Sequence, residues 1–172
     1  MGVWGESGMF AVFGGATGSG YGVLGYAPSG YAVYSNGNFA AVNGTKSAIV
    51  TTSQGNRTLY SQESPEVWFE DVGEGQLVGG LAHIALDPLF LETVTINDQH
   101  PMKVFIQLND DCNGVYVQRQ TTGFEVVELG SGNSRAHFTY RVMAKRKGFE
   151  TTRLEAAAAS PKQAAALKAP VK

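Results

Sequence analysis

Charge is nearly absent from the first quarter of this chain. The 172 residues include 13 basic and 15 acidic ones, and Glu6 is the only one of these before residue 45. The same segment, residues 1–44, holds 12 of the 22 glycines. Two kinds of sequence therefore meet near Gly44. We expect a Gly-rich segment over 1–44, a separate domain over 45–153 and an Ala-rich tail over 154–172.

Valine recurs in the Gly-rich segment with a small residue before it and, in the first four copies, an aromatic residue or leucine after it. The steps between these valines are 9, 11, 10 and 9 residues. The five positions are Val3, Val12, Val23, Val33 and Val42. Gly, Ser and Asn between them allow the chain to turn with positive φ. Each repeat therefore predicts a strand of three or four residues followed by a tight turn.

Such short strands cannot be stable in a single copy. Ordering a residue costs about 1–2 kcal/mol, and a four-residue strand flanked by Gly or Ala buries little area. Large side chains such as Trp4, Tyr21 and Tyr34 have almost no charged neighbours to keep them in water. We expect stacked repeats and identical strands of other chains to cover them. A flexible Gly/Ser linker and a silk-like aggregating segment remain alternatives.

The passage from repeats to domain carries a family resemblance. The run Gly-Tyr-Ala-Val-Tyr-Ser-Asn-Gly-Asn-Phe at 30–39, followed by Gly-Thr-Lys-Ser-Ala at 44–48, resembles the stalk-to-head region of bacterial and phage trimeric fibre proteins. Segments 59–66, 80–90 and 138–148 are similar to a head domain that follows such stalks. The resemblance spans about residues 1–153 and brings no catalytic or binding motif with it.

The resemblance implies a fold and a role. The fold is all-β, with an intertwined homotrimeric repeat stalk of the β-prism or triple β-helix kind and an antiparallel β-sandwich-like head. The role is that of an extracellular fibre tip, on a cell surface, a virion or an injection device. Its partners would be two further copies of the chain and a cell-surface glycan or other envelope receptor. A glycan-cleaving head and a purely structural connector remain the other possibilities.

Alternation with period two predicts strands in the head. In 136–145 the residues Ala136, Phe138 and Val142 fall on one face, and 102–108 alternates in the same way. Weaker candidates are 47–52, 57–61, 77–86, 93–97, 114–118 and 123–129. Strands of this length and spacing predict an antiparallel sandwich or barrel. Helical character is almost absent before the tail, where Pro161 interrupts an Ala-rich run.

Three polar turns are the candidate ligand site. They contain Asp98-Gln99-His100, Asp110-Asp111-Cys112-Asn113 and 130–134. Small polar side chains on anchored loops suit hydrogen bonding to a glycan, and Tyr116 could stack on a sugar ring. We therefore name Asp110, Asp111, Asn113, His100 and Tyr116 as candidate ligand residues, together with Trp68 of the acidic segment. Ordinary hairpin connections are the alternative.

An acidic segment with two aromatic residues offers a further site. Five carboxylates lie within 63–74, around Trp68 and Phe69: Glu63, Glu66, Glu70, Asp71 and Glu74. A glycosidase could take its two carboxylates and its sugar platform, Trp68, from such a segment. A charge run is more often solvated. We expect a solvated connection between strands, with Trp68 at least partly packed.

Other chemistry lacks support in the sequence. His83, His100 and His137 have no metal-ligand spacing, and Cys112 has no identifiable catalytic partner. We predict no enzyme activity, no metal and no cofactor. A net charge of −2 without a basic run argues against nucleic acid. Without 18 consecutive apolar residues, no segment is expected to insert in a membrane as a helix.

Overall fold

The computed structural model describes residues 14–41 and 44–156, and these fall into two compact units. The division lies between Met1–Ser61 and Gln62–Lys172. This division lies further along the chain than the boundary expected near Gly44, and one hairpin separates the two positions. In that hairpin β1 (Ser47–Thr52) pairs antiparallel with β2 (Gly55–Tyr60), and Gly55, at φ 90°, closes the turn. We call the second unit the head.

Residues 14–41 contain a repeating contact but no strand. A Cβ added at Gly14 would lie 2.5 Å from Val23 Cγ2, and one at Gly25 would lie 2.9 Å from Val33 Cγ2. The glycine that ends one repeat thus contacts the valine of the next. The short strands expected here are absent, because a strand needs hydrogen bonds to a neighbouring strand. Val3, Val12 and Val42 lie outside the described residues.

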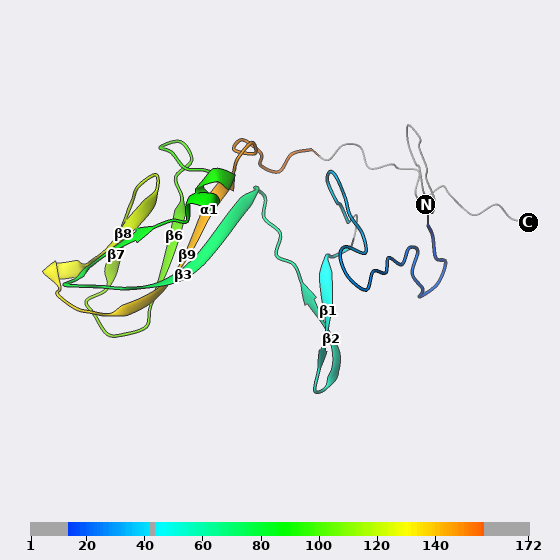
Figure 1. The fold of residues 1–172 in the computed structure, drawn as a ribbon, viewed down its shortest axis with the longest axis horizontal. Helices are drawn as coiled ribbons and strands as arrows, with labels where there is room; N and C mark the ends of the chain where they lie inside the picture. The colour runs from blue at the N-terminus through cyan, green and yellow to red at the C-terminus, as the bar shows by residue number, and fades with distance from the viewer. Residues whose placement is uncertain (1–13, 42–43, 157–172) are drawn as a thin grey trace, which may run out of the picture. The chain divides into compact units, whose positions relative to one another are not determined.

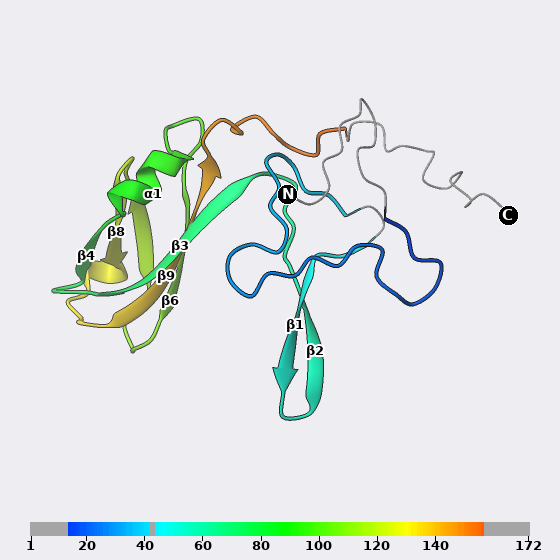
Figure 2. The same ribbon diagram turned by 45° about the vertical axis from the view of Figure 1, so that its right-hand side comes forward.

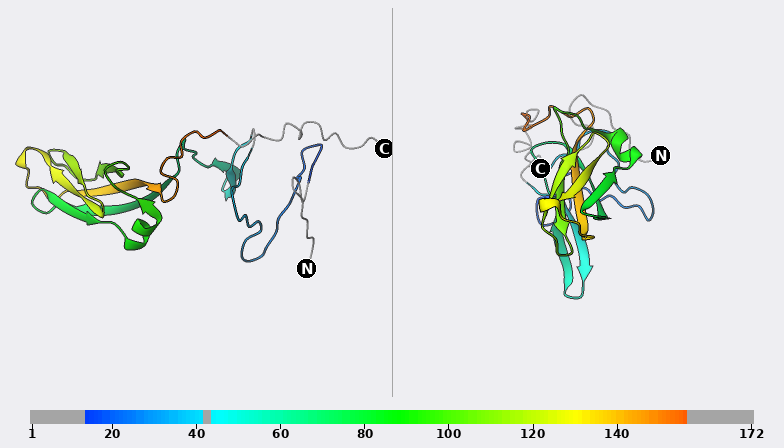
Figure 3. Two further views of the ribbon diagram at one scale, coloured as in Figure 1. Left: turned by 90° about the horizontal axis from the view of Figure 1, so that it is seen from above. Right: turned by 90° about the vertical axis from the view of Figure 1, so that its left-hand side faces the viewer.

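Two antiparallel sheets form the head (Figures 1 and 3). The first has four strands. Its central strand is β9 (His137–Arg146), which pairs with β3 (Trp68–Gln76), β5 (Val94–Thr95) and β6 (Lys103–Leu108). The second has three strands: β4 (Leu81–Ala85), β8 (Gly123–Glu128) and β7 (Val115–Arg119). The all-β, antiparallel fold class predicted from the sequence is confirmed.

One hydrophobic core joins the two sheets. Phe138 and Val142 of β9 and Phe124 and Val126 of β8 are at most 1% exposed. They alternate with exposed or half-buried neighbours, as the period-two pattern predicts. Side chains from both inner faces therefore fill the space between the sheets.

Two glycines of β3 make room for aromatic rings of β9. Gly75 pairs with Phe138, and Gly73 pairs with Tyr140. A Cβ at either glycine would overlap the ring of its partner. The rings therefore lie against the two glycines of β3, and Tyr140 packs edge-on to Phe124 with centroids 5.3 Å apart. Glycine is needed here for close approach.

Two expectations for the head are wrong. Residues 63–74 were expected to form a solvated connection, but 68–76 form β3, the longest partner of β9. Glycines at Gly73 and Gly75 hide its alternation. A short helix, α1 (Pro88–Thr93), also lies where none was expected. Asp87 caps it by accepting the Leu89 N–H at 2.6 Å, and Pro88 suits its first turn.

The chain enters and leaves the head at one end, which we call the entry end (Figures 1 and 2). Trp68 pairs with Lys145 there, and the Leu154 N–H donates to the Pro65 carbonyl at 2.9 Å. At the other end, which we call the far end, Gln76 pairs with His137. The far end holds the turns that follow β3, β6 and β8.

Replacing Gly75 by alanine should destabilise the head by about 1–3 kcal/mol, because the added methyl group displaces the Phe138 ring from a packed core. Glu74→Ala, on the exposed side of the same strand, is the matched control and should stay within about 0.5 kcal/mol of wild type. Urea unfolding measures both. Equal stability of the two variants would contradict the ring-over-glycine packing.

Candidate functional site

Two of the three candidate turns meet at the far end. The turn 109–114 joins β6 to β7, and the turn 129–136 joins β8 to β9. The Leu129 N–H donates to the Gly114 carbonyl at 2.9 Å, and the Asn109 N–H donates to the His137 carbonyl at 2.9 Å. Both turns are therefore fixed to each other and to the sheets.

Glu128 is the buried centre of this arrangement. Its side chain is on the core side of β8, and the residue is 5% exposed. One carboxylate oxygen accepts the Asn113 N–H at 3.0 Å and the other accepts the Ser134 N–H at 2.8 Å. These hydrogen bonds, that from Asn113 first, lower the pKa of Glu128 despite its desolvation. One carboxylate thus fastens both turns.

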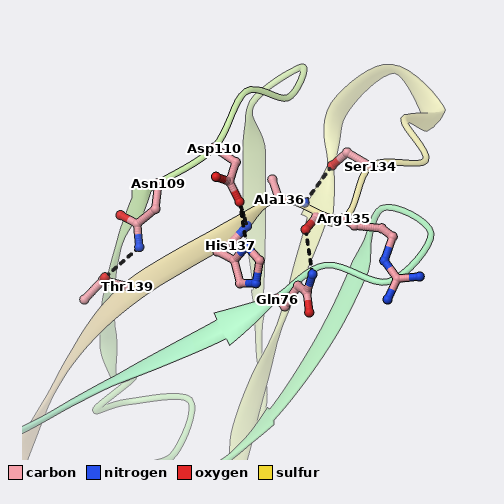
Figure 4. A network of polar contacts seen from close by, with 8 residues as sticks. All are labelled: Gln76, Asn109, Asp110, Ser134, Arg135, Ala136, His137 and Thr139. Carbon is pink, nitrogen blue, oxygen red and sulfur yellow. Dashed lines mark hydrogen bonds and ion pairs between the residues drawn. The ribbon is translucent and has the colours of Figure 1, made fainter.

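Asp110 is also part of the frame. Its Oδ2 accepts the His137 N–H at 2.8 Å and lies 2.6 Å from His137 Nδ1 (Figure 4). The backbone hydrogen bond from His137, followed by the contact with its ring, lowers the pKa of Asp110. Asp110 therefore holds the start of β9, and its carboxylate is partly occupied.

Further polar contacts continue across this end of the sheet (Figure 4). The Asn109 amide donates to Thr139 Oγ1 at 3.0 Å, and the Gln76 amide donates to the Arg135 carbonyl at 3.0 Å. The side chains of Asp111, Asn113 and Arg135 are exposed and take no part in the contacts of the described residues. Free hydrogen-bonding groups thus sit on a fixed polar base.

The other candidate residues lie elsewhere. The His100 N–H donates to Asn97 Oδ1 at 2.8 Å, in the loop before β6, at the entry end. Trp68 is half-buried at the same end, with Lys145 Nζ 4.9 Å from its ring centroid. The turn containing His100 precedes β6 and the turn 109–114 follows it, so the two turns lie at opposite ends of this strand. The structure therefore does not bring the third candidate turn to the other two.

Tyr116 borders an apolar slot between β6 and β7. The slot has a volume of about 500 Å³, and its lining is aliphatic apart from Tyr116 itself. Those residues are Val104, Ile106, Leu108, Val115 and Val117. Tyr116 Oη accepts a hydrogen bond from Gln118 at 3.3 Å. This surface is apolar, unlike the far-end turns.

The carboxylates of the acidic segment have different partners, and those within β3 point to different faces of the strand. Glu66 lies 3.2 Å from both Lys145 Nζ and Arg153 Nη1, and Glu70 accepts from Arg141 Nε at 2.8 Å. Burial alone would raise the pKa of Glu66, but the hydrogen bonds from these two cations lower it. Glu70 and Asp71 are successive residues of one strand and point to opposite faces.

Sequence reasoning missed Glu128, His137 and Arg135 as parts of this end. A signal existed for Glu128, which is in phase with the buried Phe124 and Val126 of β8. A carboxylate at an inward position needs hydrogen-bond partners. Nothing in the sequence indicated that the partners are backbone N–H groups of two separate turns.

No protein-family model, curated protein or solved structure gives a significant match to this chain. Within residues 14–41 and 44–156, no three His, Cys, Asp or Glu side chains gather in a way that could hold a metal ion. None of the helices in that part of the chain is long and apolar enough to cross a membrane.

Glu150 gives the entry end a dependence on pH. Its Oε1 accepts from Thr95 Oγ1 at 2.5 Å and from the Gly148 N–H at 3.0 Å. These bonds, that from Thr95 first, lower the pKa of Glu150 from an ordinary 4.5 to about 2. Because the folded pKa is the lower one, this carboxylate stabilises the fold above pH 4.5.

We predict that this stabilisation is lost as the pH falls from 4.5 towards 2, the two pKa values of Glu150. Glu150→Gln should therefore have a smaller loss of unfolding free energy than wild type over that range. Urea unfolding at a series of pH values measures the difference, with Glu92→Gln on α1 as the control. Identical pH dependence in Glu150→Gln and wild type would contradict the assignment.

Proposed function

We propose that this chain is the tip region of a homotrimeric fibre that attaches to a cell-surface glycan or other envelope receptor, without turning it over. The observation that carries the proposal is the surface of the first unit. Tyr21, Tyr26 and Tyr31 are each more than 80% exposed, and Leu24 is 77% exposed. A single copy buries too little apolar area to hold this backbone in place.

The hairpin of the first unit supports the same proposal. Ile49 and Tyr60 lie on one face and Val50 and Leu59 on the other, and all four are exposed. An isolated two-stranded hairpin is at best marginally stable in water. Apolar residues on both faces require cover on both sides. Two further copies of the same hairpin around a common axis would supply it.

The repeats offer a way for copies to approach. Gly14 and Gly25 leave no room for a side chain beside Val23 and Val33. Successive turns of the chain therefore stack closely along the segment. Three such chains wound about one axis would form the β-prism or triple β-helix stalk, with Tyr21 and Tyr31 among the side chains that become covered.

The far end of the head is the proposed attachment surface. It lies opposite the point where the chain enters from the first unit, as the register of β3 and β9 shows. Asp111, Asn113 and Arg135 provide acceptors and donors there, on turns fixed through Glu128. Groups held in place before binding lose little conformational entropy when a ligand arrives.

The alternatives have weaker support. A glycan-cleaving head would need two free carboxylates facing one sugar, whereas Glu66 and Glu70 are paired with cations and Asp71 faces away from Glu70. Asp71 faces the core side instead, where burial first and the charge of Asp71 second raise the pKa of Tyr140. A purely structural connector would not need free polar groups on a fixed frame.

The 172-residue chain should have a solution mass of about three times its 18.3 kDa monomer mass. Three copies are expected because the exposed apolar residues of 14–61 require cover. Light scattering across a range of concentrations measures the mass. A shortened chain that starts at Gln62 is the companion sample, and it should lose most of the trimer. A monomer at every concentration would contradict the fibre proposal.

Attachment to cells should be lost in the double variant Asp111→Ala/Asn113→Ala, with the melting midpoint and the mass unchanged. Both side chains are exposed and make no contact that holds the fold. The control is Glu92→Ala on α1, an exposed carboxylate outside the attachment surface, which should attach like wild type. Fluorescent trimer counted on whole cells gives the readout. Wild-type attachment by the folded double variant would remove this turn from the site.

The isosteric variant Glu128→Gln tests the frame beneath the same surface. Its amide N–H would face the N–H of Asn113 or Ser134, so one hydrogen bond becomes a repulsive donor-donor contact. Both attachment and the melting midpoint should fall.

An array of glycans followed over time separates the three functions, because an enzyme consumes its ligand and a connector binds none.

A further inference from the structure

A second polar hollow, separate from the far-end turns, opens at the entry end of the head. It has a volume of about 270 Å³ and lies between the loop that precedes β6 and the loop that follows β7. Ile96 and Pro101 supply its accessible apolar part, over the buried Met102. Asp98, Arg119 and Thr121 are among its polar residues. This volume falls just below the roughly 300–1,000 Å³ of pockets that hold drug-sized ligands, so the hollow suits one small unit such as a sugar ring.

Both loops are fixed before any ligand binds. Asn97 Oδ1 accepts the N–H groups of Gln99 at 3.0 Å and His100 at 2.8 Å, which shapes the first loop. The Gln120 N–H donates to the Gly123 carbonyl at 2.9 Å in the second loop. Arg119 Nη1 then joins the loops by donating to the Met102 carbonyl at 3.0 Å.

Several polar groups of the hollow remain available. Asp98 and Thr121 are exposed, and no contact among the described residues engages either side chain. The Met102 carbonyl takes one N–H of Arg119, and the guanidinium has four others. Residues that carry a carboxylate, a hydroxyl group and a guanidinium therefore line one hollow with an apolar part.

This combination selects the class of ligand. A carboxylate and a guanidinium in one small hollow disfavour a simple anion as well as a simple cation, because each would meet a like charge. A ring with several hydroxyl groups can donate to Asp98 and accept from Arg119. Its C–H face can pack on Pro101 and Ile96. Met102, at 0% exposure, makes the floor rigid.

We propose that this hollow binds one neutral sugar residue, as the terminal unit of the glycan to which the fibre attaches. The ligand class rests on the proposed function, while the hollow itself does not depend on the trimer. Each head then has two contact surfaces, the far-end turns and this hollow. Attachment to cells needs the far-end turns, whereas a single sugar binds in the hollow without them.

The test is a titration of the whole chain with single sugars, followed by NMR shifts of the backbone amides of 119–121. A panel of neutral hexoses and N-acetylhexosamines is the probe, with an acidic sugar and a free amino acid as comparison. At least one neutral sugar should shift these amides. Asp98→Ala should weaken that binding at least tenfold, and Glu92→Ala, an exposed carboxylate on α1 outside both surfaces, should leave it unchanged.

Arg119→Lys provides a second variant, because lysine can still donate to the Met102 carbonyl but offers fewer N–H groups to a sugar. It should also bind more weakly while its melting midpoint stays near that of wild type. The proposal is overturned if no neutral sugar shifts these amides. Shifts caused only by the acidic sugar or the amino acid, or equal binding by Asp98→Ala and wild type, also overturn it.

The outcome can be separated from that of the fibre proposal. A trimer that attaches to cells but whose hollow ignores sugars overturns the hollow alone. A monomer whose 119–121 amides respond to a sugar through Asp98 overturns the trimer and keeps the hollow.

Discussion

The head depends on the pairing of β9 with three other strands. β3 lies along one edge of β9, while β5 and β6 share the other edge, so one ten-residue strand organises the whole first sheet. Its buried residues Phe138 and Val142 then join this sheet to β8 through the core. Because the two aromatic rings of β9 lie over Gly73 and Gly75, the position of β3 is fixed by side-chain shape as well as by hydrogen bonds.

That arrangement also separates the two ends of the head. Because β3 and β9 are antiparallel and pair along their full length, the start of β3 and the end of β9 lie at the same end of the sheet. The chain therefore enters and leaves the head at that end. The far end is left to the turns, which Glu128 fastens from below. A buried carboxylate is stable there because two backbone N–H groups replace the water it has lost. The same bonds leave Asp111 and Asn113 facing solvent on a rigid base.

The first unit follows a different physical rule. Its described residues place valine and aromatic side chains in solvent, and the contacts within one copy cover almost none of them. The repeated approach of Gly14 to Val23 and of Gly25 to Val33 is local order without a core. Local order of this kind becomes stable when further copies cover it. In the proposed trimer, three-fold symmetry would give each copy the same surroundings.

The sequence by itself determined the local features of this protein. Alternation over a few residues was enough to place β6, β8 and β9, and the charge boundary near Gly44 was visible without a structure. The pattern failed at β3, because Gly73 and Gly75 stand where the inward side chains would be. It also gave no sign that His100 lies far from Asp111, or that Asp98 and Arg119 share a hollow. Alternation depends on neighbours two residues apart, whereas the meeting of turns depends on which strands pair and in which register. Only the tertiary structure could decide those positions.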